Sequence, residues 1–153
     1  MNANSPRGYL LDTNILSAFA PNKPALSLEF TAWLRAHSDR LFVPCIAIAE
    51  LDQGVSKLRR AGSTVRAEQL TDWLEGLINH YAQRILPLDA ASSRLAGRLA
   101  DQAIAAGQYP GLADTVIAAL AQQAGLIVLT GNIRHFTALG VECINPFEQL
   151  PDV

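Results

Sequence analysis

The sequence is poor in cysteine and has no long apolar run. Its only two cysteines, Cys45 and Cys143, lie about a hundred residues apart. That number and spacing fit neither a disulfide framework nor a zinc site, so we expect buried, reduced thiols. No apolar run approaches the ~18 residues that a membrane span needs. The polar segment 1–6 lacks the basic and apolar blocks of a secretory signal, so we expect a cytoplasmic protein.

Positive charge is not in excess either. Twelve Lys and Arg against fourteen Asp and Glu give a net charge of -2, so no global positive field draws nucleic acid or anionic lipid to the chain. Half of the 153 residues are apolar, and glycine and proline number only 10 and 8, which excludes a disordered or collagen-like chain. A chain of this length forms one domain, so we expect residues 1–153 to share one core.

Short apolar runs alternate with segments of helical periodicity along the whole chain. Strands are expected at 9–11, 41–43, 85–88, 126–129 and 141–144, and helices at 26–37, 46–61, 70–81, 89–106 and 112–124. Parallel strands need crossover connections, and these are usually helical. The pattern therefore predicts an α/β protein, a three-layer α/β/α sandwich around a mostly parallel sheet of four to five strands.

Four polar residues stand at or just beyond the carboxyl ends of expected strands, where ligands bind in open parallel sheets. Asp12 follows the first strand, Glu50 lies one turn into the helix after the second, and Asn132 follows the fourth. Asp114 lies in the first turn of its helix, on the same face as Ile117, which is unusual for a solvated acid. We expect all four side chains to approach one edge of the sheet.

Each acid also has an ordinary explanation. Asp12 could bond local backbone, Asp114 could be a displaced helix cap, and Glu50 could belong to a salt bridge. Together, however, three carboxylates in one partly desolvated site repel one another, and a divalent cation removes that repulsion. Ligation by oxygen alone suits Mg²⁺ or Mn²⁺ rather than zinc. The chemistry that follows is metal-assisted hydrolysis of a phosphodiester.

Five segments in this order and spacing resemble the PIN-domain ribonucleases, and more narrowly the VapC toxins of the plasmid-stability branch. They are LLDTNILS from Leu10, VPCIAIAEL from Val43 followed by Gly54, LADTVIAALA from Leu112, LTGNIRHF from Leu129 and INPF from Ile144. The resemblance covers nearly the whole chain. It implies a single PIN domain over residues 1–153 and a Mg²⁺- or Mn²⁺-dependent endoribonuclease, the toxin of a type II toxin–antitoxin pair.

The resemblance also implies roles for individual residues. Asp12, Glu50 and Asp114 would hold the metal, and Asn132 would occupy the fourth catalytic position. The implied partners are a cognate VapB-like antitoxin, an RNA substrate and a second copy of the chain in a homodimer, with no membrane. Gly131 stands where relatives often carry a basic residue, which removes one expected phosphate contact.

Other residues are expected to support the site. Thr13, Asn14 and Thr130 would bond the ligands or the metal's water. RNA contacts are expected from Lys57, Arg59, Arg60, Arg134 and His135, and Arg66 belongs to the same basic cluster as the first three. Two other interpretations stay open: a phosphohydrolase in which Asp12 is the covalent nucleophile, and a degenerate PIN module that binds RNA or protein without cutting.

Overall fold

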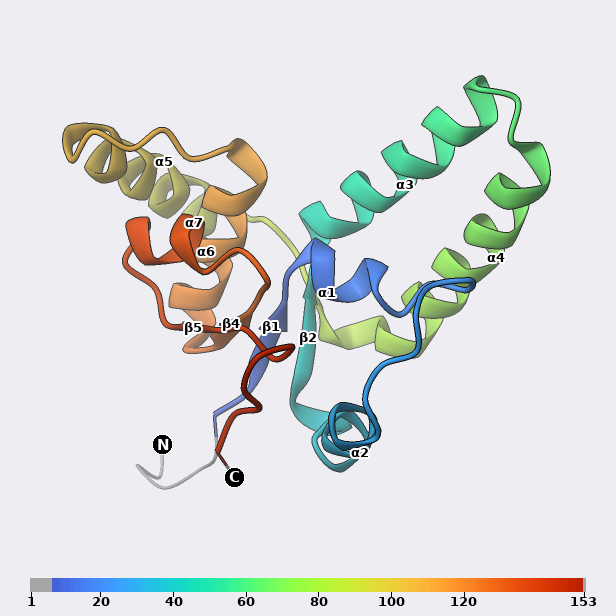
Figure 1. Cartoon of the computed structure of the whole chain (residues 1–153). Helices are drawn as coiled ribbons and strands as arrows, with labels where there is room; N and C mark the ends of the chain where they lie inside the picture. The colour runs from blue at the N-terminus through green and yellow to red at the C-terminus, as the bar shows by residue number, and fades with distance from the viewer. Residues whose placement is uncertain (1–6, 153) are drawn as a thin grey trace.

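A computed structural model describes residues 7–152, which form a parallel sheet with helices on both faces (Figure 1). The strand order is β3-β2-β1-β4-β5, and every neighbouring pair is parallel. The strands are β1 (Tyr9–Leu11), β2 (Leu41–Pro44), β3 (Ile85–Leu86), β4 (Ile127–Leu129) and β5 (Cys143–Ile144). The prediction of an α/β sandwich with four to five strands is confirmed. The expectation about a signal at 1–6 lies outside the described residues.

Helices cover the sheet in two groups, each with its own core (Figure 1). One group comprises α1 (Thr13–Ser17), α2 (Leu28–Ala36), α3 (Cys45–Arg60) and α4 (Thr64–Tyr81), and the other α5 (Ala90–Ala105), α6 (Leu112–Ala124) and α7 (Ile133–Ala138). Short 3₁₀ turns at Ser38–Arg40 and Ala82–Arg84 lead into β2 and β3. No helix within residues 7–152 has the length and apolar character to span a bilayer.

Large aromatic rings fill the core beside α2, whereas small residues fill the core between α5 and α6. Trp33 of α2 packs edge-on against Tyr9 of β1, with ring centroids 5.0 Å apart. On the other face, Ala96 and Ala103 of α5 lie in the same core as Ala118 of α6. Alanine lets two helices approach closely, because no side chain extends beyond Cβ at the contact.

Helix ends follow the sequence closely. Asp89 caps α5, with its side chain accepting from the backbone N–H of Ser92. Gly125 ends α6 in the left-handed conformation, at φ 68°, which glycine adopts without strain.

Three expected strands are shorter than predicted, because their outer residues bond elsewhere. Pro87 has no N–H to donate to a ladder, and β3 ends before it. The N–H of Leu126 donates to Ala121 at the end of α6, and the N–H of Val141 donates to Phe136 at the end of α7.

The two cysteines are free, as expected, but they are only half-buried, so the expectation of buried thiols is wrong. Cys143 lies in the edge strand β5, which has a neighbour on one side only. Cys45 is the first residue of α3, at the carboxyl edge of the sheet.

Candidate active site

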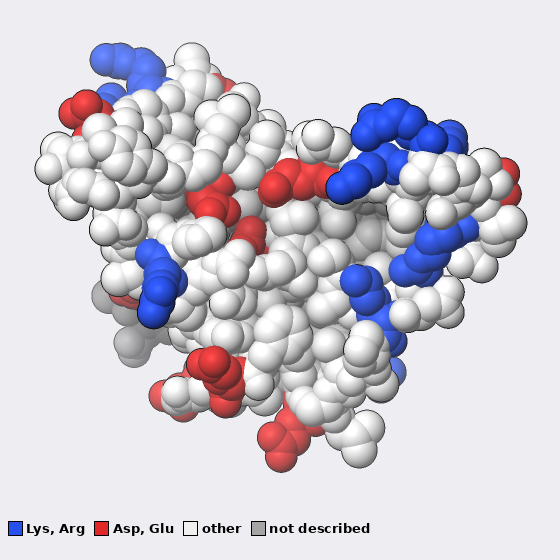
Figure 2. Space-filling view, turned by 45° about the horizontal axis from the view of Figure 1, so that its top comes forward, with Lys and Arg blue, Asp and Glu red and all other residues white. Residues whose placement is uncertain are grey.

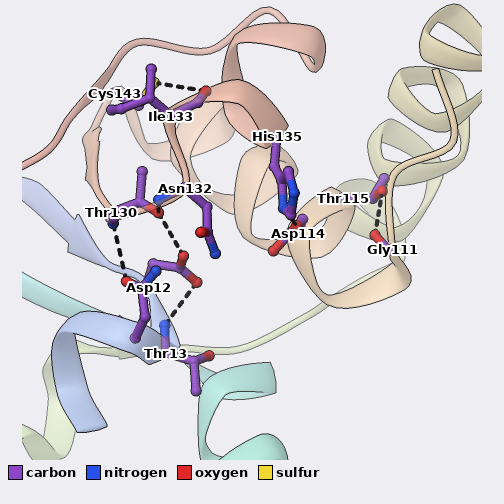
Figure 3. Close-up of polar contacts among 12 residues, drawn as sticks. Asp12, Thr13, Gly111, Asp114, Thr115, Thr130, Asn132, Ile133, His135 and Cys143 are labelled. Carbon is purple, nitrogen blue, oxygen red and sulfur yellow. Dashed lines mark hydrogen bonds and ion pairs between the residues drawn. The ribbon is translucent and has the colours of Figure 1, made fainter. Parts of the chain in front are cut away.

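Asp12 lies between β1 and α1, and it is the most buried carboxylate of the site, with 4% of its surface exposed. Its backbone N–H donates to Leu129 of β4 at 3.0 Å, which fixes it at the carboxyl edge of the sheet. The N–H of Thr13 donates to Oδ1 at 2.7 Å, and the Thr130 hydroxyl donates to Oδ2 at 2.7 Å (Figure 3). Both oxygens are therefore held in fixed directions.

Burial raises the pKa of the Asp12 carboxyl above its ordinary value. The hydrogen bonds from Thr130 and Thr13 favour the charged form and act in the opposite direction, whereas the nearby carboxylates of Asp114 and Glu50 raise the pKa further. The carboxylate between β1 and α1 and those on α3 and α6 thus lie close enough to act on one another electrostatically. The expectation that they approach one edge agrees with this arrangement.

Glu50 lies in α3 and is exposed to solvent. Its Oε1 accepts a hydrogen bond from the Thr13 hydroxyl at 2.6 Å. Within residues 7–152 it forms no salt bridge, so the salt-bridge explanation for this acid finds no support there.

Asp114 is the third residue of α6, whose N-cap is Gly111, so it is not a displaced cap. Its side chain is only 21% exposed, in agreement with its place on the apolar face of the helix. Its Oδ2 lies 2.7 Å from Nδ1 of His135, which comes from α7 (Figure 3). This pairing was missed in the sequence, because twenty-one residues separate the two side chains.

The loop after β4 supports the site from the other side. The Thr130 hydroxyl, which donates to Asp12, also accepts from the N–H of Asn132 at 2.9 Å. The side-chain amide of Asn132 points toward Asp12 (Figure 3). The N–H of Gly131 donates to Oδ1 of Asn14 at 3.2 Å, and a Cβ at Gly131 would lie 3.3 Å from Nδ2 of that residue. A side chain at position 131 would therefore press on Asn14.

Among residues 7–152, no three His, Cys, Asp or Glu side chains are grouped closely enough to hold a metal ion together. Two of the three acids are turned toward other partners, since Glu50 bonds Thr13 and Asp114 bonds His135. The donor chemistry nevertheless fits a hard divalent ion, because Asp12 is a buried carboxylate whose charge is opposed by burial and by two further acids.

Asp12, Glu50 and Asp114 together form an acidic centre. Basic side chains gather on one side of it (Figure 2). Lys57, Arg59 and Arg60 occupy the last turn of α3, and two of them, Lys57 and Arg60, line a hollow together with Glu50. Arg59 donates to the Thr71 hydroxyl at 3.3 Å. The predicted cluster at this helix end is therefore present, and it adjoins one of the acids.

Lys23 and Arg66 line a second hollow that Glu50 and Thr13 also border. Arg66 was recognised in the sequence as part of the basic cluster, but Lys23 was missed. Lys23 is far from the other basic residues in the sequence, so no sequence pattern indicated that it lies near Arg66 in the structure. Arg134 lies in α7 on the opposite side, next to His135.

The PIN domain family matches residues 9–141, and the chain belongs to this family. PIN-domain nucleases depend on divalent metal ions. Two similar curated proteins are the VapC ribonuclease Y4jK of Sinorhizobium fredii and the plasmid stability protein StbB of Pseudomonas syringae. The first is 35% identical over 91% of this chain and 97% of the relative. The second is 33% identical over 91% of this chain and 98% of the relative.

Solved structures agree with this assignment. The structure of FitAcB from Neisseria gonorrhoeae is 31% identical, with a TM-score of 0.78, over 91% of this chain and 98% of that chain. A member of the VapBC family of toxin-antitoxin systems from Mycobacterium tuberculosis is 27% identical, with a TM-score of 0.64, over 92% of this chain and 99% of that chain. The resemblance to PIN-domain nucleases of the VapC type is confirmed.

Proposed function

We propose that this chain is a Mg²⁺- or Mn²⁺-dependent endoribonuclease that serves as the toxin of a toxin–antitoxin pair. Asp12, Glu50 and Asp114 hold the metal in this proposal, and Asn132 completes the site. The observation that supports it most strongly is the environment of Asp12, a buried carboxylate whose pKa is raised by burial and then by two further acids. A divalent ion is the simplest group that stabilises such an arrangement in its charged form.

When bound, the ion would supply an activated water and neutralise charge on the attacked phosphate. The chain's own residues position the ligands. Thr130 and the Thr13 N–H hold both oxygens of Asp12 in place, and the Thr13 hydroxyl holds Glu50 beside it. His135 fixes one oxygen of Asp114, which leaves the other free to face the centre.

In this proposal, RNA approaches the acidic centre along the basic residues at the end of α3. A substrate phosphate is repelled by the three carboxylates, so cations at the rim must offset that repulsion. Lys57 and Arg60 share a hollow with Glu50 and are placed to do this. The net charge of -2 means that such contacts stay local.

A toxin-antitoxin relative supports the antitoxin partner, whereas the homodimer stays a prediction. One similar structure belongs to a toxin-antitoxin system, and the chain covers almost the whole of that protein. An arginine of the antitoxin would suit the acidic centre, because a guanidinium binds carboxylates with two parallel hydrogen bonds. Co-expression with any small reading frame found immediately upstream of the gene, followed by size-exclusion chromatography, tests both partners.

A cleavage assay tests the proposed activity. Purified protein is incubated with structured RNA and Mg²⁺ or Mn²⁺, beside Asp12→Asn, Asp114→Asn and the control Asp101→Asn, an exposed acid of α5. We expect cleavage by the unaltered protein and the control, and none with EDTA or with either site variant. Intact RNA in every sample, together with retained RNA binding, would instead identify a passive module.

A further inference from the structure

A separate hollow of about 280 Å³ lies beside the acidic centre, between the loop before α6 and helix α7. Tyr109 and Pro110 line it from the loop, and Arg134 and His135 line it from α7. His135 connects the hollow to the site, because its Nδ1 lies 2.7 Å from Oδ2 of Asp114. Only the His135 side chain would therefore separate a group bound in the hollow from Asp114, a proposed metal ligand.

Tyr109 is the unusual member of this hollow. Its surface is 83% exposed, whereas Tyr9 and Tyr81 are both buried in the core. Pro110 follows it and restricts its backbone to extended conformations, so the ring is presented on a stiffened loop. The fold gains little packing from a ring in this position, but an exposed aromatic face is what an unpaired base stacks on.

Arg134 supplies the second element of a nucleotide site. Its side chain is exposed, and within residues 7–152 it has no hydrogen bond or ion pair. A guanidinium binds phosphate through parallel hydrogen bonds and also stacks on bases. A ring, a free cation and an imidazole around one hollow match a base with its attached phosphate better than an aliphatic ligand.

We propose that this hollow binds one unpaired nucleotide of the RNA next to the cleaved bond, with its base stacked on Tyr109 and its phosphate bound by Arg134. This inference rests on the proposed ribonuclease function and adds a base-binding site to it. In an A-form helix the base faces are stacked on their neighbours and cannot reach a side chain. The protein therefore selects a single-stranded segment or a loop at this position.

A binding experiment with a fluorescent base tests the inference. A single-stranded RNA of about twelve nucleotides carrying 2-aminopurine is titrated into protein with the Asp12→Asn substitution, which is expected to remove cleavage. We expect quenching of 2-aminopurine fluorescence on binding. Adding Tyr109→Ala should abolish the quenching and weaken binding on the order of tenfold, as loss of one base stack does. Tyr109→Phe should keep both, and Arg134→Ala should weaken binding without abolishing the quenching.

Two control substitutions match these changes in kind. Leu28→Ala removes an exposed apolar side chain from α2, and Arg98→Ala removes an exposed cation from α5, both away from the hollow. Neither should alter binding by more than about twofold. Equal quenching with and without the Tyr109→Ala substitution would overturn the inference. So would a change of oligomeric state in Tyr109→Ala on size-exclusion chromatography, since a second copy would then cover the ring and the exposed Leu112 beside it.

The cleavage assay separates this inference from the proposed function. If the unaltered protein cleaves RNA in a metal-dependent way and Tyr109→Ala leaves KM unchanged, the nuclease stands and the base site is wrong. If the unaltered protein cleaves no RNA, the proposed function is wrong, and the loss of quenching in Tyr109→Ala still establishes the base site.

Discussion

The two helices that carry the outer acids of the site are held in different ways. In α6, every residue from 115 to 121 is buried, so the helix that carries Asp114 is surrounded by protein. In α3, only Ala47 and Val55 are buried, and Glu50 faces solvent. Figure 1 shows α3 and α4 extending as a hairpin from the sheet edge, while α6 packs against α5 and the sheet.

This difference divides the site into a fixed half and an adaptable half. Asp12 and Asp114 sit on elements that tight packing holds in one arrangement, because close-packed interiors deform little. Glu50 and the basic residues of α3 lie on the hairpin of α3 and α4, which we call the arm. Because only two residues of α3 are buried, we predict that this arm adjusts more readily to a bound ligand than α6 does. The fixed half suits metal binding, which needs defined positions, and the adaptable half suits recognition of a large ligand.

The largest expected effect is a difference in the rate of RNA cleavage between variants of Asp114 and of Glu50. Asp114→Asn should lower the rate of RNA cleavage about a thousandfold, because it removes the charge of a proposed metal ligand that movement of the tightly packed α6 cannot replace. Glu50→Gln should lower it by about tenfold, since glutamine keeps an amide oxygen and the exposed α3 position leaves its side chain room to present it. Single-turnover rates at saturating Mg²⁺ measure both. Equal losses in the two variants would contradict the division.

Stability should show the same contrast. Ile117→Ala in α6 removes a fully buried side chain and should lower the free energy of unfolding by about 2–5 kcal/mol. Leu51→Ala in α3, where the side chain is half-buried, should lower it by about 1 kcal/mol. Urea unfolding followed by circular dichroism gives both values. A larger loss for Leu51→Ala would show that the arm is packed as firmly as α6.

The buried charge at Asp12 should reduce stability in the absence of metal. Because the folded-state pKa is raised, the folded protein binds the proton more tightly than the unfolded chain does, so stability is lost as pH rises through that pKa. Metal-free Asp12→Asn, which carries no charge at this position, should therefore be more stable than the unaltered protein at neutral pH. This difference in stability should disappear as the pH falls toward the ordinary pKa of aspartate. Thermal unfolding of both proteins with EDTA across this pH range measures the difference. A difference that does not change with pH would contradict the raised pKa of Asp12.

The smallest expected effect concerns the basic arm. Lys57→Glu with Arg60→Glu should leave the fold unchanged and reduce the salt dependence of RNA binding. Each lost phosphate contact should lower the slope of log K against log salt by about 0.7 for single strands. The matched change Arg94→Glu with Arg98→Glu on α5 serves as the control. An identical slope in both double variants would remove the arm from the RNA path.

The sequence predicted most of the fold because local signals and tertiary packing agree. Gly125 and Asp89 mark helix ends through backbone preferences that hold in any context. The position of Asp12 was predictable too, since a polar residue directly after a buried parallel strand lies at the carboxyl edge of the sheet. Strand lengths were less predictable, because Leu126 and Val141 give their N–H groups to helix ends.

The contacts inside the site could not be predicted in the same way. Thr130 donates to Asp12 across 118 positions of sequence, and His135 pairs with Asp114 although both could have faced solvent. Such pairings depend on where β4 and α7 are placed by the whole sheet. Tyr109 lacked any periodic signal, because it lies in a loop between two helices.

The bond from Thr130 to Asp12 has a consequence for biosynthesis. The hydroxyl that holds the acid is made 118 residues after the acid itself, together with the strand that accepts its backbone N–H. A growing polypeptide therefore has no assembled centre until β4 has been translated and has left the ribosome. On the proposed ribonuclease function, a nascent chain would therefore have no complete site with which to act on RNA before that point.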